Sequence, residues 1–173
     1  GKACDEAGFF WWEDPYQDGG VSQFSHRKLR QMVKTPLLQT EHIRMLEQHV
    51  DFIVADGTDL VRAGAHEDGG ITGVMKIAHA SEGFGLDVEL HGPGPAHRHL
   101  MTSIRNTNYF EMGLVHPNVP STKSPVYLDY FDDLISIDEN GCVEAPNKPG
   151  LGVSLDWDWI KKHETDRGII AEK

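Results

Sequence analysis

Four ionisable residues each follow a short apolar segment of the chain. Glu13 and Glu41 stand at the ends of two successive segments, and His91 and Glu111 follow two later ones. Carboxylates on neighbouring segments suit a hard divalent cation such as Mg²⁺, which takes oxygen ligands and keeps positions open for a substrate. A histidine beside them suits proton transfer near neutral pH. These residue types predict a metal-assisted acid–base site, provided that the fold brings them together.

The apolar segments alternate with amphipathic ones, which predicts an α/β fold of βα units around a parallel sheet. Strands covered on both faces are apolar rather than alternating, which is how these short segments read. In a parallel α/β barrel all strands end on the face that carries the active site, so the four ionisable residues are expected to converge there. The strands are predicted at residues 9–12, 37–40, 59–63, 86–90 and 108–110, and the helices at 22–33, 43–55, 71–84 and 95–105.

Apolar positions at helical spacing predict which side chains of these helices face the core. In the first helix they are Phe24, Leu29 and Met32, and in the second they are Leu46, Val50, Ile53 and Val54. The residues before Gly8 resemble the last turn of a helix, with Gly8 as its left-handed stop. The chain does not begin with Met, and we expect it to be part of a longer protein.

The last third of the chain has a different pattern, so we expect a barrel domain at 1–115 and a C-terminal extension at 116–173. Asn140-Gly141 is typical of a tight turn between two short strands, which predicts a hairpin. The predicted parts of the extension are a loop at 116–123, hairpin arms at 135–137 and 142–144, a tight loop at 149–153 and a short helix at 156–163.

Composition excludes several classes of function. The 173 residues include 27 acidic and 16 basic ones, a formal net charge of −11. Nucleic-acid binding needs a basic patch, so a nucleic-acid partner is not expected. An apolar run of the ~18 residues that a membrane helix needs is not seen, and we expect a cytoplasmic protein. Cys4 and Cys142 do not form a disulfide framework or a zinc site.

The histidines leave alternatives open. A single carboxylate or histidine after a strand is usually solvated or structural, and only the joint pattern at four strand ends favours a site. His97 and His99 resemble the metal motif of a small double-stranded β-barrel, but helical flanks argue against this and favour a place beside the site or the substrate. The others are expected mostly on the surface, with His42 able to reach the pocket because it follows Glu41: His26, His42, His49, His66, His79, His116 and His163.

On these residues the chain resembles the C-terminal barrel of the enolase superfamily, in the mandelate racemase-like group that includes acid-sugar dehydratases. The pair Gly69-Gly70 with Thr72-Gly73, followed by His91 at the next strand end, is the most specific match. The matching segments, in the family's order, are Trp12–Pro15, Thr40–His42, Asp68–Gly73, His91, Glu111 and Pro149–Val153.

The resemblance implies a TIM-like (β/α)₇β barrel of which about strands 4 to 8 are present. Its C-terminal segment would return toward a cap domain that this chain lacks. Glu13 and Glu41 match the family's second and third metal carboxylates, and Mg²⁺ is the implied cofactor. His91 matches the catalytic histidine, and Glu111 matches the carboxylate that hydrogen-bonds the substrate.

The implied reaction is Mg²⁺-dependent removal of the proton α to a carboxylate. Its implied outcome is dehydration of an acid sugar to a 2-keto-3-deoxy sugar acid by a lyase, with His91 as acid or base. Two alternatives stay open: a racemase or epimerase of the same superfamily, and a non-catalytic enolase-like scaffold. The family also implies a homo-oligomer for the full-length protein.

The chain departs from the family in three respects. The first metal carboxylate and a lysine motif lie upstream of Gly1, and so does the cap. The aspartate that pairs with the family's histidine falls on Gly64, for which His66 or Asp68 are candidate substitutes. We therefore expect this chain to be inactive without the missing N-terminal half and cap.

Overall fold

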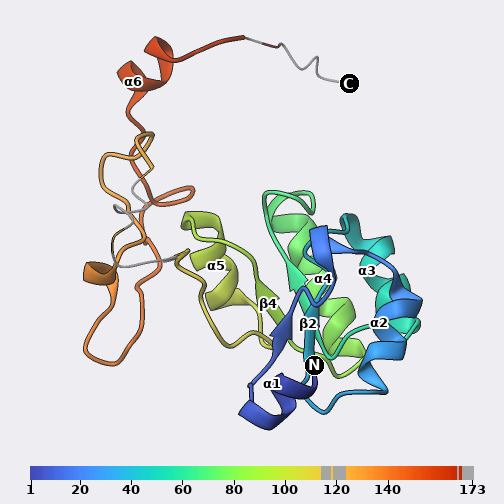
Figure 1. Cartoon of the computed structure of the whole chain (residues 1–173). Helices are drawn as coiled ribbons and strands as arrows, with labels where there is room; N and C mark the ends of the chain where they lie inside the picture. Colours follow the sequence, from blue (N-terminus) through green and yellow to red (C-terminus); the bar gives the residue numbers. More distant parts are fainter. Residues whose placement is uncertain (114–117, 119–123, 167, 169–173) are drawn as a thin grey trace.

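The fold is part of an α/β barrel. The computed structural model describes residues 1–113, 118, 124–166 and 168, and within them a four-stranded parallel sheet has the order β1-β2-β3-β4 (Figure 1). Trp12 pairs with Leu37, Leu38 with Leu60, and Val61 with Val88. The predicted alternation of strands and helices is thus confirmed. The strands are β1 (Trp12–Glu13), β2 (Leu37–Gln39), β3 (Leu60–Ala63) and β4 (Val88–Leu90), and the helices are α1 (Lys2–Ala7), α2 (Gln23–Arg30), α3 (Met45–Val54), α4 (Gly70–Gly83) and α5 (Pro95–Ser103).

The core lies between the sheet and α4. This helix places Val74, Ile77 and Ala78 at spacings of three and four residues, so that they share one buried face. They pack with side chains of β3 and β4 such as Val61 and Val88. Burial of each large aliphatic side chain contributes about 1.5–3 kcal/mol. Helix α4 therefore covers the apolar side chains of β3 and β4 that face it, although the strands are not wholly apolar, since Arg62 and Glu89 lie within them.

Glycine is required where α4 begins. A Cβ on Gly73 would lie 1.6 Å from the carbonyl oxygen of Asp68, so no side chain fits there. Gly69, at the N-cap of the helix, has φ +79°, a left-handed conformation that glycine adopts without strain. The glycine pair and Gly73 thus let the chain turn tightly from β3 into α4.

For two helices, the prediction of which side chains face the core was partly wrong. Phe24 is 61% exposed and Met32 is also exposed, whereas His26 is buried. His26 and Leu29 are three residues apart and share the inner face of α2, while Phe24 points elsewhere. In α3, Phe52 and Ile53 are buried but Val54 is exposed, because it lies one residue further round the helix.

The first predicted strand is shorter than expected. The chain leaves α1 at Gly8, whose φ of +66° confirms the predicted helix stop. It reaches the sheet only at Trp12, whose amide donates to the carbonyl of Pro36 at 2.8 Å. Phe10 is therefore 70% exposed rather than buried.

The fifth predicted strand, at 108–110, does not form. The Glu89 carboxylate accepts from the amide of Tyr109 at 3.0 Å, and its other oxygen accepts from the side-chain amide of Asn108 at 2.8 Å. A side chain thus takes the place of a backbone ladder partner. The segment still runs beside β4, since the Val88 amide donates to the Asn106 carbonyl.

The C-terminal part lies beyond α5 (Figure 1). The Asp138–Gly141 turn closes on a single antiparallel bridge between Ile137 and Val143, a shorter hairpin than predicted. The short helix is confirmed as α6 (Trp157–Lys162), whose N-cap Asp156 accepts from the Trp159 amide. A 3₁₀ turn spans Leu134–Ser136, and another, before α2, spans Gln17–Gly19. Apart from Asn118, the loop expected at 116–123 lies outside the described residues.

Two predicted absences can be checked in the described residues. Cys4 and Cys142 are free thiols. Among the described helices, none has both the length and the apolar character needed to cross a membrane.

Candidate functional site

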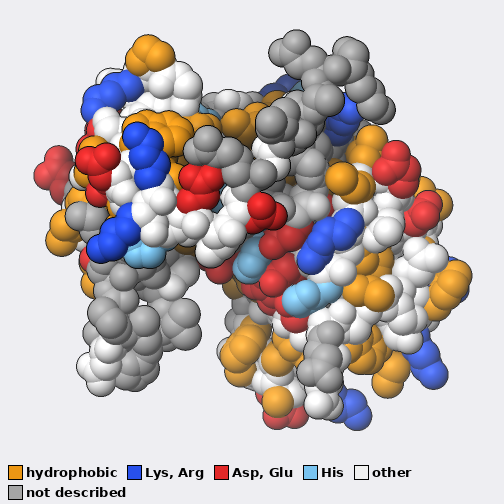
Figure 2. All heavy atoms as spheres, turned by 90° about the horizontal axis from the view of Figure 1, so that it is seen from above, with side chains coloured by type: hydrophobic (Ala, Val, Ile, Leu, Met, Phe, Trp, Pro, Cys, Tyr) orange, Lys and Arg blue, Asp and Glu red, His pale blue; other side chains and the backbone are white. Residues whose placement is uncertain are grey.

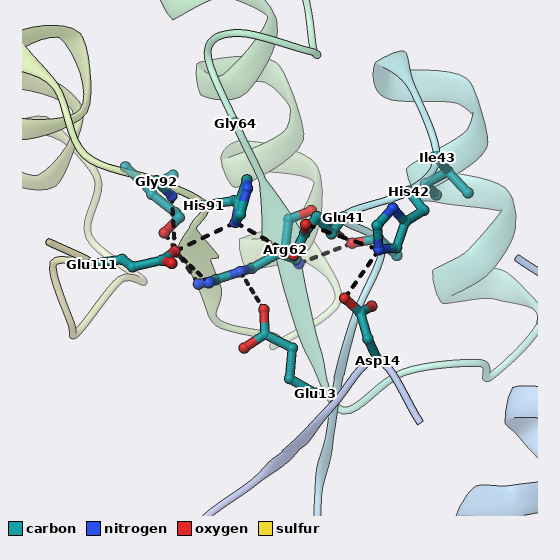
Figure 3. A network of polar contacts seen from close by, with 12 residues as sticks. Glu13, Asp14, Glu41, His42, Ile43, Arg62, Gly64, His91, Gly92 and Glu111 are labelled. Atoms are coloured by element: carbon teal, nitrogen blue, oxygen red, sulfur yellow. Dashed lines mark hydrogen bonds and ion pairs between the residues drawn. The ribbon is translucent and has the colours of Figure 1, made fainter. Parts of the chain in front are cut away.

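The predicted ionisable residues come together at the carboxyl ends of the strands. Glu13 is the last residue of β1, and Glu41 and His91 follow β2 and β4. Glu111 reaches the same place from the segment after 108–110, and Figure 3 shows all four side chains turned toward one another. Seen from above, acidic and histidine side chains gather near the middle of the molecule (Figure 2). The parallel sheet explains this convergence, because its strands all end at one edge.

His91 lies between two carboxylates. Its Nδ1 is 3.4 Å from Glu41 Oε2 and 3.4 Å from Glu111 Oε2. The hydrogen bond with Glu111 raises the pKa of His91 above its ordinary value, burial opposes the change, and the charge of Glu41 adds to it. His91 therefore keeps its proton to a higher pH than a free histidine, which suits a proton donor.

Glu111 is the most strongly stabilised anion of the group. Its Oε2 accepts from the Gly92 amide at 2.8 Å and contacts Arg62. The hydrogen bond with His91, followed by that of the Gly92 amide and the charge of Arg62, lowers the pKa of Glu111 to about 2. Glu111 is thus a hydrogen-bond acceptor throughout the physiological range.

This low pKa predicts how Glu111→Gln changes stability with pH. A carboxyl group whose pKa is lower in the folded than in the unfolded protein stabilises the fold at pH values above its unfolded-state pKa. This stabilisation is lost as the pH falls through its folded-state pKa. We expect the parent to be more stable than the variant at pH 6, and the difference to disappear between about pH 4.5 and pH 2. Urea midpoints at a series of pH values measure this. A difference independent of pH would contradict it.

Arg62 is a member of the site that the sequence analysis did not single out. Its Nε lies 2.7 Å from Glu13 Oε1, and its Nη2 contacts Glu111 Oε2. Burial raises the pKa of Glu13, while the charge of Arg62 opposes the change. One signal was available, since an arginine inside an otherwise apolar strand must find partners when it is buried.

The donors for a cation are oxygen-rich. One oxygen each of Asp14 and Glu41 and a ring nitrogen of His42 lie within 4.8 Å of one another. His42 Nε2 is 3.1 Å from Asp14 Oδ2, so His42 reaches the site, as the sequence allowed. Carboxylates on neighbouring strand ends are the ligand type that Mg²⁺ prefers, so the residues present fit a hard divalent cation.

Neither proposed substitute for the side chain missing at Gly64 faces His91. Asp68 is buried, and it accepts from the Gly64 amide at 2.9 Å and the Met45 amide at 3.0 Å. His66 is exposed. The Glu67 side chain lies against Gly64, because a Cβ on Gly64 would lie 2.5 Å from Glu67 Oε2. The Glu67 carboxylate thus occupies the place of a side chain at position 64, which the sequence analysis missed.

Among the histidines that the structure describes, three are buried, and two of these were expected on the surface. Ring nitrogens of His26 and His49 lie 2.7–3.0 Å from backbone carbonyl oxygens, which accept hydrogen bonds from the protonated ring nitrogens; the carbonyls belong to Ser22, Met45 and Arg62. His97 Nε2 accepts from the Ala65 amide at 2.9 Å. This bond places His97 beside the loop after Gly64, and its burial lowers its pKa, so it stays neutral.

A parallel half-barrel with acidic and histidine groups at its strand ends defines a barrel domain of the enolase type. Residues 1–159 match the model of the family described as Enolase C-terminal domain-like. The chain belongs to this family. The resemblance seen in the sequence is confirmed.

Curated relatives are acid-sugar dehydratases. D-gluconate dehydratase from Thermoproteus tenax is 22% identical over 164 residues, which are 93% of this chain and 32% of that protein. D-xylonate dehydratase from Haloferax volcanii is 25% identical over 171 residues, 94% of this chain and 39% of that protein. The chain therefore spans between about a third and two fifths of the length of these relatives.

Solved structures agree in fold. D-glucarate dehydratase from Agrobacterium tumefaciens, complexed with magnesium, is 30% identical with a TM-score of 0.76, and the match covers 93% of this chain and 41% of that one. A member of the enolase superfamily from Polaromonas sp. JS666 is 21% identical with a TM-score of 0.78, covering 96% and 43%. The latter shows the fold alone.

Proposed function

We propose that this chain is part of a Mg²⁺-dependent acid-sugar dehydratase. The enzyme would remove the proton α to the substrate carboxylate and expel a hydroxyl, giving a 2-keto-3-deoxy sugar acid. The observation that carries the proposal is the convergence of Glu13, Glu41, His91 and Glu111 at the strand ends. The dehydratase activities of the relatives support it.

The charge state of each residue suggests its role. His91, whose pKa is raised by the neighbouring carboxylates of Glu111 and Glu41, gives its proton to the departing hydroxyl. Glu111, ionised and fixed by the Gly92 amide, accepts hydrogen bonds from hydroxyls of the sugar. Both groups are partly exposed, so a substrate in the barrel mouth can reach them.

Glu13 and Glu41 would hold the cation. Asp14, Glu41 and His42 each offer a ligand atom within 4.8 Å of the others, whereas Glu13 pairs with Arg62 and lies outside this group. When bound, Mg²⁺ supplies the positive charge that makes the α-proton of a carboxylate substrate more acidic. Burial raises the pKa of Glu13, and a cation close by would favour its charged form.

The test is a substrate screen with the complete product of the gene. Acid sugars are incubated with the protein and Mg²⁺, and a 2-keto acid product is detected with semicarbazide. Formation of the keto acid, and its loss in Glu41→Gln, supports the proposal. A product that differs only in configuration would instead show the epimerase alternative. Absence of any change in all the acid sugars would reject both.

The second candidate function is a non-catalytic scaffold. It is favoured by the lack of a side chain at Gly64, where the family resemblance places the aspartate that pairs with the histidine. Residue 64 follows Arg62 at a spacing of two, so its side chain would point to the same face of the sheet, toward the site. The carboxylate of Glu67 already lies there. We propose that Glu67 does for His91 what a carboxylate at position 64 would do, which favours an enzyme.

This proposal predicts the effect of moving the carboxylate. We expect Glu67→Gln to lower turnover at least about tenfold, less than the ~10⁴-fold loss for the aspartate of a catalytic triad, because Glu41 and Glu111 also face His91. Adding Gly64→Asp to that variant restores part of the rate. Steady-state kinetics of the three proteins measure both effects. Equal rates in the parent and Glu67→Gln would contradict the role of Glu67.

The boundary between 1–115 and 116–173, the homo-oligomeric state and the cytoplasmic location stay predictions. The proposed activity also requires the N-terminal half and the cap of the whole enzyme, because the family resemblance places the remaining metal carboxylate upstream of this chain.

A further inference from the structure

Arg62 is a nearly buried cation that joins three separate parts of the site. Its side chain is 7% exposed. Nε contacts Glu13 at the end of β1, Nη2 contacts Glu111, and Nη1 donates to the Leu90 carbonyl at 3.1 Å. The planar guanidinium therefore fixes two carboxylates relative to each other and to β4.

The base of this side chain is itself held firmly. The Thr40 hydroxyl accepts from the Arg62 amide at 2.9 Å and donates to the Arg62 carbonyl at 2.7 Å. His49 Nε2 lies 3.0 Å from the same carbonyl. Thr40 and His49 are fully buried, so these contacts are shielded from water. Arg62 is thus a rigid support for the groups at the strand ends.

We propose that Arg62 is a positioning residue for the divalent cation, because its guanidinium fork holds Glu13 in a ligating orientation and Glu111 across from it. The inference rests on the proposed function, in which Glu13 is a metal ligand. Arg62 engages only Oε1 of Glu13, and within the described part of the chain Oε2 makes no hydrogen bond or ion pair. Oε2 is then the oxygen left for the cation.

A simple effect of charge predicts the opposite result. A positive charge next to a metal site repels the metal, so removal of Arg62 would then tighten binding. Support by the ion pair between Arg62 and Glu13, in contrast, depends on geometry, and outer partners that orient metal ligands typically contribute 10–100-fold to metal affinity. The variant Arg62→Lys distinguishes the effect of charge from that of geometry. Lysine keeps the positive charge but cannot contact Glu13, Glu111 and Leu90 at once.

The experiment is a Mn²⁺ titration of the complete gene product, with free Mn²⁺ measured by electron paramagnetic resonance. Mn²⁺ is the probe because it takes the same oxygen ligands as Mg²⁺. We expect Arg62→Lys to bind Mn²⁺ about 10–100-fold more weakly than the parent. Arg98→Lys is the matched control, since Arg98 is a buried fork that pairs with Asp132 away from the strand ends. Its affinity should equal that of the parent.

Several outcomes would overturn the inference. Unchanged or tighter binding in Arg62→Lys would do so, and so would an equal loss in Arg98→Lys, which would reflect general loosening. If Arg62→Lys fails to fold by far-UV circular dichroism, Glu111→Gln carries the test. It removes one arm of the bridge without touching a proposed ligand, and we expect binding about threefold weaker or more. Unchanged binding there overturns the inference.

Different outcomes of the titration would reject the proposed metal site and the proposed role of Arg62. A parent protein that binds no Mn²⁺ rejects the metal site itself and the inference with it. A parent that binds Mn²⁺ and loses nothing in Arg62→Lys rejects only the role of Arg62.

Discussion

Replacing His91 by asparagine lowers turnover of acid sugars by about 10²–10⁴-fold, the usual contribution of a general acid or base. Asparagine keeps much of the size and one hydrogen bond toward Glu41 and Glu111, but it cannot transfer a proton. The loss should therefore fall on kcat more than on KM. Steady-state kinetics of the complete gene product measure it once a substrate is known.

His79→Asn is the control for this prediction. His79 is exposed on α4 and makes no hydrogen bond or ion pair among the described residues, so its variant should keep the parent's rate. Thermal unfolding and Mn²⁺ binding should be unchanged in His79→Asn. A rate within tenfold of the parent in His91→Asn would remove His91 from the proton transfer and leave the proposed mechanism without an acid.

Arg98→Met destabilises the fold by about 3–5 kcal/mol, the cost of leaving a buried partner charge uncompensated. Arg98 donates to Asp132 from Nε at 3.0 Å and from Nη2 at 2.6 Å, and both side chains are under 10% exposed. It also donates to the carbonyls of Phe131 and Glu144. These bonds tie the C-terminal part to α5. Urea unfolding measures the loss.

Two further variants sharpen this prediction. Arg105→Met removes a surface ion pair with Glu82, and since Arg105 is 86% exposed we expect a loss below about 1 kcal/mol. Adding Asp132→Asn to Arg98→Met removes the buried charge and should recover part of the stability. If Arg98→Met costs no more than Arg105→Met, the contact between the C-terminal part and the barrel is not held by this pair.

The fold class followed from local patterns. Apolar strands, and helices with a single apolar face, can bury their apolar side chains only when the helices cover the sheet. This is why β2 and β4 were predicted within a few residues, and why Gly8 ends α1 as expected. The segment at 108–110 has the composition of a strand, but its amides bond to Glu89, a competition that no local pattern reveals.

The chemistry of the site followed from one topological rule. Because parallel strands end at one edge of a sheet, residues that follow them must lie close together, and Glu13, Glu41 and His91 do. The neighbours of these groups did not follow from that rule. Arg62 lies one residue before the end of β3, and Glu67 enters the site because the turn after Gly64 folds back on it.

The sequence by itself determined the order of strands and helices and the residue types at the strand ends, since both depend on spacing along the chain. Only the tertiary structure decided which charges meet. Distances of 2.5–3.4 Å between Arg62, Glu13, Glu111 and His91 depend on strand register and side-chain direction. Electrostatic interactions vary steeply over such distances, so the ionisation of the site follows from packing between strands that are far apart in sequence.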